Sequence, residues 1–132
     1  MSFFRGGGLM GSTATGLGGQ GKSATATTAD ATAVAALSVG TTSTKIMQIE
    51  AWITATNTAG DKYFSAHLGG LFDGTTLLEP VQQIDWHNSA NAAAWQADLA
   101  SSGSNVVVNV TGEASEDITW KVRVNYTIVN AG

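Results

Sequence analysis

The sequence predicts an all-β protein, an antiparallel β-sandwich of jelly-roll type preceded by an extended glycine-rich N-terminal arm. Three observations lead to this prediction. After residue 30, apolar and polar residues alternate with a period of two, as they do in strands that bury one face. Clusters of turn-forming residues divide this region into about seven or eight short strands. Only 12% of the 132 residues are charged, so neutral polar side chains must cover much of the surface.

The longest alternating stretches are 45–57 and 118–129. Each places an apolar residue at every second position, and 118–129 has the most regular pattern in the chain. A long strand with one apolar face belongs to an antiparallel sheet whose other face meets solvent. Trp120 is on the apolar side of its strand, and we expect it to lie in the core.

Shorter strands are expected at 62–72, 77–87 and 106–110. Pro80 marks the start of a strand or the edge of a sheet, because proline cannot donate to a β-ladder. Two alanine-rich segments are ambiguous. The threonine-rich flanks of 31–39 favour a strand, whereas the segment 91–100 fits a short helix or a strand equally well.

The chain divides into an arm over residues 1–29 and a β-sandwich domain over residues 30–132. The arm is rich in glycine, alanine and threonine, and ordering its backbone would require more conformational entropy than its apolar surface could offset. Apolar residues and an arginine nevertheless lie near the N-terminus, so we expect the arm to become ordered on a partner. The predicted contacts of the arm are Phe3, Phe4, Arg5, Leu9, Met10 and Lys22.

Residues 16–23 read GLGGQGKS, which matches the pattern of a nucleotide-binding P-loop. A working P-loop lies between a strand and a helix, which aim backbone amide groups at the phosphates. No strand pattern precedes Gly16, and the threonines after Ser23 disfavour a helix. We therefore expect no nucleotide cofactor. The glycines fit better with a backbone that lies flat on a neighbouring subunit.

Charge and composition exclude several classes of partner. The net charge of −4 and the absence of a basic stripe disfavour nucleic acid. No cysteine is present, so the chain has neither disulfides nor thiolate metal sites. No apolar run is long enough to cross a bilayer, and the N-terminus lacks the pattern of a signal peptide. We expect a protein that is soluble in the cytoplasm where it is made, without a membrane partner.

Few residues offer catalytic chemistry. Asp85 lies two residues before His87, and His67 lies on another expected strand, but no third ligand or nucleophile is spaced beside them. The acidic residues of 111–117 lack the spacing of a calcium loop and are expected in a solvated turn. We predict no catalytic, cofactor-binding or metal-binding residue, and no enzyme activity.

Trp52 is predicted to point away from the apolar side of strand 45–57, among Gln48, Glu50 and Thr54. An outward tryptophan can contact another subunit or stack on a sugar ring. Because the surface has so few charges, we favour a subunit interface, and a carbohydrate platform is the alternative.

The C-terminal third resembles the closing portion of a β-sandwich domain that recurs in virion proteins of tailed bacteriophages. In that domain a V-x-V-T-G-x-A segment precedes an I-x-W strand. The stretch 49–72 is similar to the earlier strands and turn of the same domain, and the resemblance covers roughly residues 28 to 129. The matching positions of the two motifs are Val108, Val110, Thr111, Gly112, Ala114, Ile118 and Trp120.

This resemblance implies a structural protein of the virion, assembled in the cytoplasm of the bacterial host. We expect a capsid decoration or cement protein, a homo-oligomer and most simply a trimer, whose arm and sandwich bind different subunits of the major capsid protein and so stabilise the phage head. The alternative is a subunit of a tail or collar fibre or appendage, with a receptor- or glycan-binding sandwich.

Overall fold

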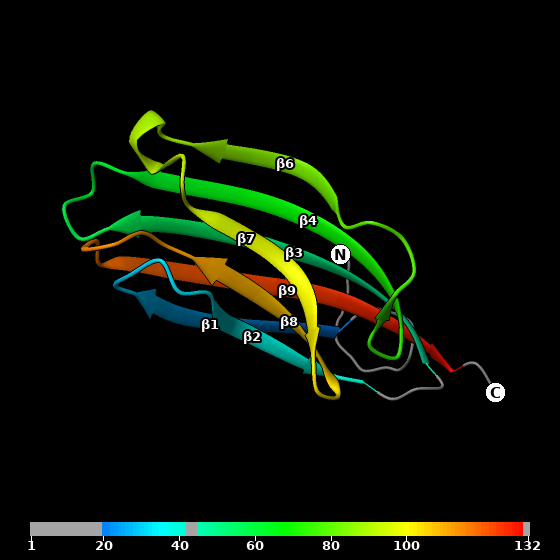
Figure 1. Cartoon of the computed structure of the whole chain (residues 1–132). Coiled ribbons are helices and arrows are strands. Elements are labelled where there is room, and N and C mark those ends of the chain that lie inside the picture. Colours follow the sequence, from blue (N-terminus) through cyan, green and yellow to red (C-terminus); the bar gives the residue numbers. More distant parts are fainter. Residues whose placement is uncertain (1–19, 42–44, 131–132) are drawn as a thin grey trace.

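The computed structural model describes residues 20–41 and 45–130, and within them two antiparallel sheets pack face to face (Figure 1). This confirms the predicted all-β sandwich. The small sheet has the order β2 (Val34–Gly40), β8 (Asn105–Thr111), β7 (Gln96–Ser102). The large sheet has the order β1 (Gln20–Thr28), β9 (Ile118–Asn130), β3 (Lys45–Asn57), β4 (Tyr63–Asp73), and both β5 (Thr76–Leu77) and β6 (Gln82–Asn88) pair with β4.

The connections between the sheets explain the jelly-roll character. The chain crosses from the large to the small sheet between β1 and β2, and it crosses back between β8 and β9. β1 pairs with β9 and β2 pairs with β8, so the two crossings lie beside each other. Between them, β3, β4 and β6 form an antiparallel meander. A 3-10 turn over Ala90–Ala92 (η1) then leads into β7 in the small sheet.

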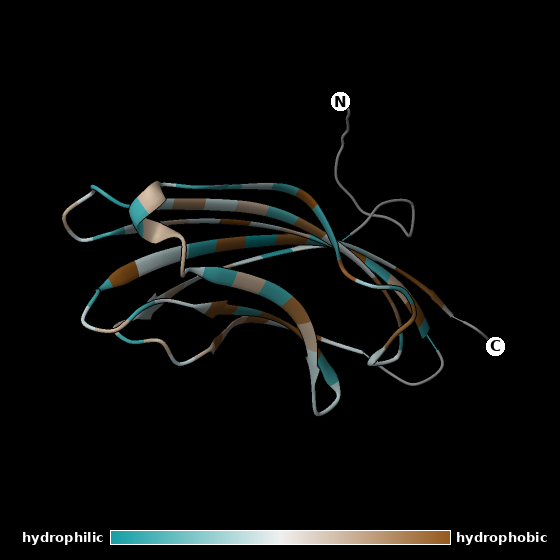
Figure 2. Cartoon of the chain, turned by 45° about the horizontal axis from the view of Figure 1, so that its top comes forward, coloured by the Kyte–Doolittle hydropathy of each residue, from teal (hydrophilic) through white to brown (hydrophobic). Residues whose placement is uncertain are grey.

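The core lies between the sheets and follows the alternation of the sequence. Figure 2 shows hydrophilic and hydrophobic residues alternating along the strands. On β3 the five inward apolar residues, from Met47 to Ala55, are at most 4% exposed. The largest fully buried side chains are Trp95, Trp120, Phe64, Phe72, Met47, Ile49 and Ile53. Burying about ten large side chains in this way supplies the main driving force for folding.

The structure defines the secondary structure of the two ambiguous alanine-rich segments, 31–39 and 91–100. Residues 34–40 form β2, as the threonine-rich flanks indicate. The segment 91–100 is divided, because its first residues complete the turn η1 and those from Gln96 onward form β7. Trp95 stands at the junction and is 1% exposed. Pro80 lies just before β6, consistent with a strand start.

Residues 20–28 lie within the predicted arm but belong to the large sheet. They form strand β1, which pairs with β9 along its whole length, from Gln20 opposite Tyr126 to Thr28 opposite Ile118. Its inward residues are alanines and threonines, too small to give the strong periodic signal of a strand. Residues 1–19 lie outside the described residues, so the division into arm and domain stays a prediction.

β1 is held where it meets the β8–β9 crossing. The indole Nε1 of Trp120 donates to the buried hydroxyl of Thr28 over 2.9 Å. Gly112 lies against the same hydroxyl, because a Cβ atom built on it would stand 2.5 Å from Thr28 Oγ1 and 2.8 Å from Ile118 Cδ1. A glycine is therefore required at this position of the motif for β1 and the crossing to approach each other.

Replacing Gly112 by alanine should destabilise the fold. The added methyl group must displace Thr28 or Ile118, and overpacking of this kind costs about 1–3 kcal/mol. Gly40→Ala is the matched control, because its Cβ would meet Asn105 Oδ1 at 3.6 Å, an ordinary contact. Urea unfolding would measure both, and equal free energies of unfolding for the two variants would contradict the proposed close approach.

Candidate functional site

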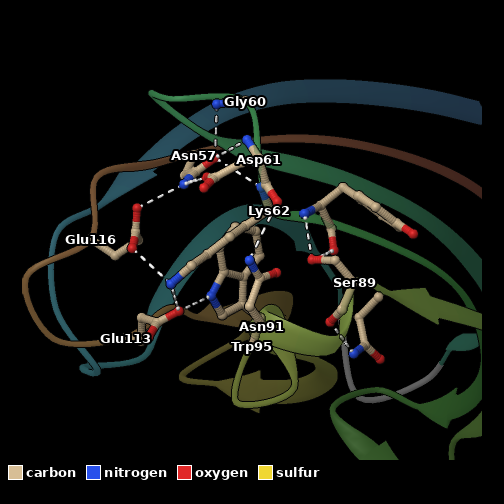
Figure 3. Close-up of polar contacts among 11 residues, drawn as sticks. Asn57, Gly60, Asp61, Lys62, Ser89, Asn91, Trp95, Glu113 and Glu116 are labelled. Atoms are coloured by element: carbon tan, nitrogen blue, oxygen red, sulfur yellow. Dashed lines mark hydrogen bonds and ion pairs between the residues drawn. The ribbon is translucent and has the colours of Figure 1, made fainter.

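One polar cluster ties together three loops at one end of the sandwich (Figure 3). Lys62, just before β4, contacts Glu113 at 3.1 Å and Glu116 at 2.9 Å, both in the β8–β9 connection. Trp95, just before β7, donates its indole Nε1 to Glu113 over 2.7 Å. These side chains are largely covered, with 18–29% exposure for the lysine and the two glutamates. We call this group the Lys62 cluster.

Asn57 holds the β3–β4 turn in place beside the Lys62 cluster (Figure 3). Its side-chain oxygen accepts from the backbone N–H groups of Gly60, Asp61 and Lys62 at 3.0–3.1 Å. Its amide nitrogen donates to Asp61 and to Glu116. Gly60 has a φ of +76°, a conformation that glycine adopts without strain. The turn and the cluster are therefore fixed as one unit.

The hydrogen bonds set the protonation of this cluster. Donation from Trp95 and from Lys62 lowers the pKa of Glu113, and donation from Lys62 and Asn57 lowers that of Glu116. The hydrogen bonds to Glu116 and Glu113 raise the pKa of Lys62. All three groups stay charged near neutral pH, so the two carboxylates are unsuited to general acid chemistry. The cluster is a structural feature, not the solvated turn that the sequence suggests.

A second group of polar residues lies on the solvent side of the large sheet. Residues directly opposite in an antiparallel pair share a face. The register places Arg123 of β9 and His67 of β4 on either side of Trp52 in β3, and Asp85 of β6 beyond His67. These residues form one row across four strands, which we call the outward row.

Trp52 is covered on both faces of its ring. The guanidinium carbon of Arg123 lies 4.2 Å from the ring centroid, and His67 stacks at 4.5 Å with an interplanar angle of 17°. Since β3 lies between β9 and β4, the two neighbours occupy opposite faces. His67 Nε2 also lies 3.0 Å from Glu50 Oε2. A sugar could not stack on Trp52 without displacing one of these neighbours, so the geometry disfavours a stacking platform.

Beside Trp52, an open groove of about 450 Å³ runs over β1, β9 and β3. Lys121 and Arg123 line it together with Trp52. Its hydroxyl groups come from Ser23, Thr25 and Thr54. No carboxylate lines the groove, and within the described part of the chain neither Lys121 nor Arg123 makes an ion pair. We call this hollow the cationic groove.

A smaller hollow of about 260 Å³ lies over Gly69 and Gly70 on the same side of the large sheet. The bulge residue Ile84, 51% exposed, forms one wall, because its Cδ1 would meet a Cβ on Gly69 at 3.3 Å. Glu50 and Glu79 make this hollow acidic. The outward side therefore carries hollows of opposite charge separated by the Trp52–His67 stack.

The structure describes two of the predicted contact residues, and their partner-binding roles stay predictions. Trp52 faces solvent as expected and belongs to the outward row. Lys22 points toward the small sheet and donates to the backbone carbonyl of Ser38 over 2.6 Å, so it is engaged within the chain. The other five predicted contacts, Phe3, Phe4, Arg5, Leu9 and Met10, lie outside the described residues.

The P-loop pattern has the wrong local structure where it is described. Its last residues, Gln20 to Ser23, run along strand β1, whereas a P-loop lysine precedes a helix. Across residues 20–41 and 45–130, no group of three histidine, aspartate or glutamate residues is placed to hold a metal ion. The same ranges contain no helix long and apolar enough to cross a membrane.

Sequence reasoning did not identify the cationic groove. Its two cations, Lys121 and Arg123, are two residues apart in the stretch 118–129, and this spacing predicts that they lie on the same face of a strand. The missing information was the neighbouring strand, because β1 supplies Ser23 and Thr25 from a segment assigned to the arm. The contacts of His67 with Trp52 and Glu50 also depend on the cross-strand register, which the alternation of the sequence does not reveal.

The Lys62 cluster should make stability fall in acid. The two carboxyl groups have a lowered pKa in the folded protein, so their contribution is complete above the ordinary value near 4.5 and is lost as the pH falls through the folded-state pKa. The double variant Glu113→Gln, Glu116→Gln should show a shallower loss of unfolding free energy below this pH than the unmodified chain, measured by urea unfolding. Glu79→Gln, a change of an exposed carboxylate, should leave the slope intact.

Removing the ring of Trp52 should loosen the outward row. Trp52→Ala loses one cation–π contact and one aromatic stack, together worth about 1–2 kcal/mol. Thr54→Ala is the control, being exposed on the same face of the same strand. Chemical denaturation would measure the free energy of unfolding of both variants. Equal values would show that the stack contributes nothing to stability.

No family model matches the sequence, and no curated protein matches it significantly. Two solved structures are similar to it. The tailspike protein of Acinetobacter baumannii phage AM24 matches 85% of this chain at 4% identity with a TM-score of 0.45. The tailspike protein of Acinetobacter phage vB_ApiP_P1 matches 96% at 17% identity with a TM-score of 0.39. The chain spans only 27% and 25% of those two chains, and likenesses of this size do not establish a shared fold or function.

Proposed function

We propose that this chain is a structural protein of a tailed-phage virion and that its sandwich is the binding module of a tail or collar appendage. The sequence resemblance supports membership of the virion. Its motif residues occupy the end of β8, the crossing to the large sheet and the start of β9. Gly112 and Trp120 are the motif residues that hold β1 in place, so the resemblance involves positions on which the fold depends.

The cationic groove is the observation that carries the appendage role. It lies on the solvent side of the large sheet and combines two cations, three hydroxyl groups and an indole. Convergent polar groups in a hollow are typical of a ligand site. Surfaces built only for packing between subunits contain fewer charges at their centre.

The cement role has less support from the described residues. It relies on residues 1–29 reaching across capsid subunits, but residues 20–28 belong to the large sheet and Lys22 is bonded to Ser38. Only residues 1–19 are left for such an arm. Contact with the major capsid protein and a trimeric state stay predictions, and so does the expectation that the chain is not an enzyme.

Labelling of intact particles tests the proposal. Antibodies against the full chain would be applied to phage particles from the genome that encodes it, with particles from a mutant carrying a stop codon in this gene as the control. Electron microscopy should find gold at the tail or collar. Label spread over the head would support the cement role instead, and particles without label would contradict any place in the virion.

A further inference from the structure

We propose that the cationic groove binds a saccharide that carries carboxylate groups. This inference deepens the appendage function and rests on it. It names Lys121 and Arg123 as the charged contacts, with the hydroxyl groups of Ser23, Thr25 and Thr54 as partners for the hydroxyl groups of the sugar.

The charge of the occupant follows from the two cations. Lys121 and Arg123 lie two residues apart on the same face of β9, where they repel each other. The lining residues include no acid, so an anionic ligand would relieve this repulsion. The chain as a whole has a net charge of −4, which makes a local pair of cations without carboxylate partners unusual for it.

The geometry of Arg123 favours a carboxylate. Its guanidinium lies over the ring of Trp52 at 4.2 Å, which restricts the rotamers of an otherwise flexible side chain. A restricted guanidinium can donate two parallel hydrogen bonds to a carboxylate at a smaller loss of conformational entropy. Lys121 is a mobile point charge beside it. One fixed and one adaptable cation suit a ligand whose acidic groups are spaced apart.

The floor of the groove distinguishes a saccharide from a peptide. Extended peptides bind to free sheet edges or to apolar pockets. Here the floor is β9, which pairs with β1 on one side and β3 on the other, so its backbone groups between Thr119 and Tyr126 are already paired. What the groove offers is side-chain hydroxyl groups and cations. Its volume of about 450 Å³ lies within the range of about 300–1,000 Å³ of small-ligand sites.

Binding of the full chain to matched oligosaccharides tests the inference. The probes are oligosaccharides of galacturonate, glucuronate or sialate, each paired with its neutral methyl ester, measured by isothermal titration calorimetry. At least one acid form should bind, its methyl ester should bind at least about tenfold more weakly, and added salt should reduce the affinity. Equal binding of acid and ester, or no binding of any acid form, would overturn the proposal.

Substitutions of the two groove cations test whether the saccharide binds in the cationic groove. Lys121→Gln and Arg123→Gln should each lower the affinity about tenfold, the effect of losing one charge-assisted hydrogen bond. The side chain of Lys121 makes no hydrogen bond or ion pair with a described residue, so its variant should fold normally. Lys45→Gln makes the same charge change at the far end of β3 and should bind as the unmodified chain does. Unchanged affinity in both groove variants would show that the ligand binds elsewhere.

Further outcomes separate the two proposals. Tighter binding of poly-L-glutamate than of every acidic saccharide would assign the groove to an acidic protein segment and overturn the saccharide. Gold at the tail without saccharide binding would leave the appendage role intact and remove this inference alone. Saccharide binding by the purified full chain, together with particles that carry no label, would support this inference and overturn the appendage role.

Discussion

Two buried indole N–H groups determine how this sandwich closes. Trp95 and Trp120 lie between the sheets, 5.8 Å apart, and each is at most 1% exposed. A buried donor without a partner would destabilise the fold by about 1–3 kcal/mol. The hydroxyl group of Thr28 accepts the hydrogen bond from Trp120. The carboxylate of Glu113 accepts the one from Trp95. Because a carboxylate near the core also needs a counter-charge, Glu113 in turn requires Lys62.

These two hydrogen bonds have consequences on opposite sides of the molecule. The contact with Thr28 fixes the end of β1 against β9, and the rest of β1 then follows β9 in register. That pairing brings Ser23 and Thr25 beside Lys121 and Arg123, which creates the cationic groove. The contact with Glu113 instead fixes the loops at one end of the sandwich. Neither of these two hydrogen bonds involves the solvent side of the large sheet, where the groove and the Trp52 stack lie.

The sequence predicts the fold well where burial alternates strongly. β3 and β9 could be identified because large apolar residues recur at every second position, and Trp120 could be assigned to the core. β1 could not, because its inward residues Ala24, Ala26 and Thr28 give almost no hydrophobic contrast. The Lys62 cluster and the outward row were also beyond reach, since both depend on which strands become neighbours. A period of two reveals the face of a residue but not its partner across the sheet.

The few charged residues of the chain are unevenly distributed in this structure. A surface with few charges favours packing between subunits. Among the described cations, however, Lys62 forms ion pairs with two glutamates and Lys22 donates to a backbone carbonyl. Lys121 and Arg123 instead share a hollow without an acid. Because no acid lines the groove itself, the potential of this pair is weakened little within it. The attraction for an anion is thus concentrated at the cationic groove, because the other hollow on the same face, lined by Glu50 and Glu79, would repel an anion.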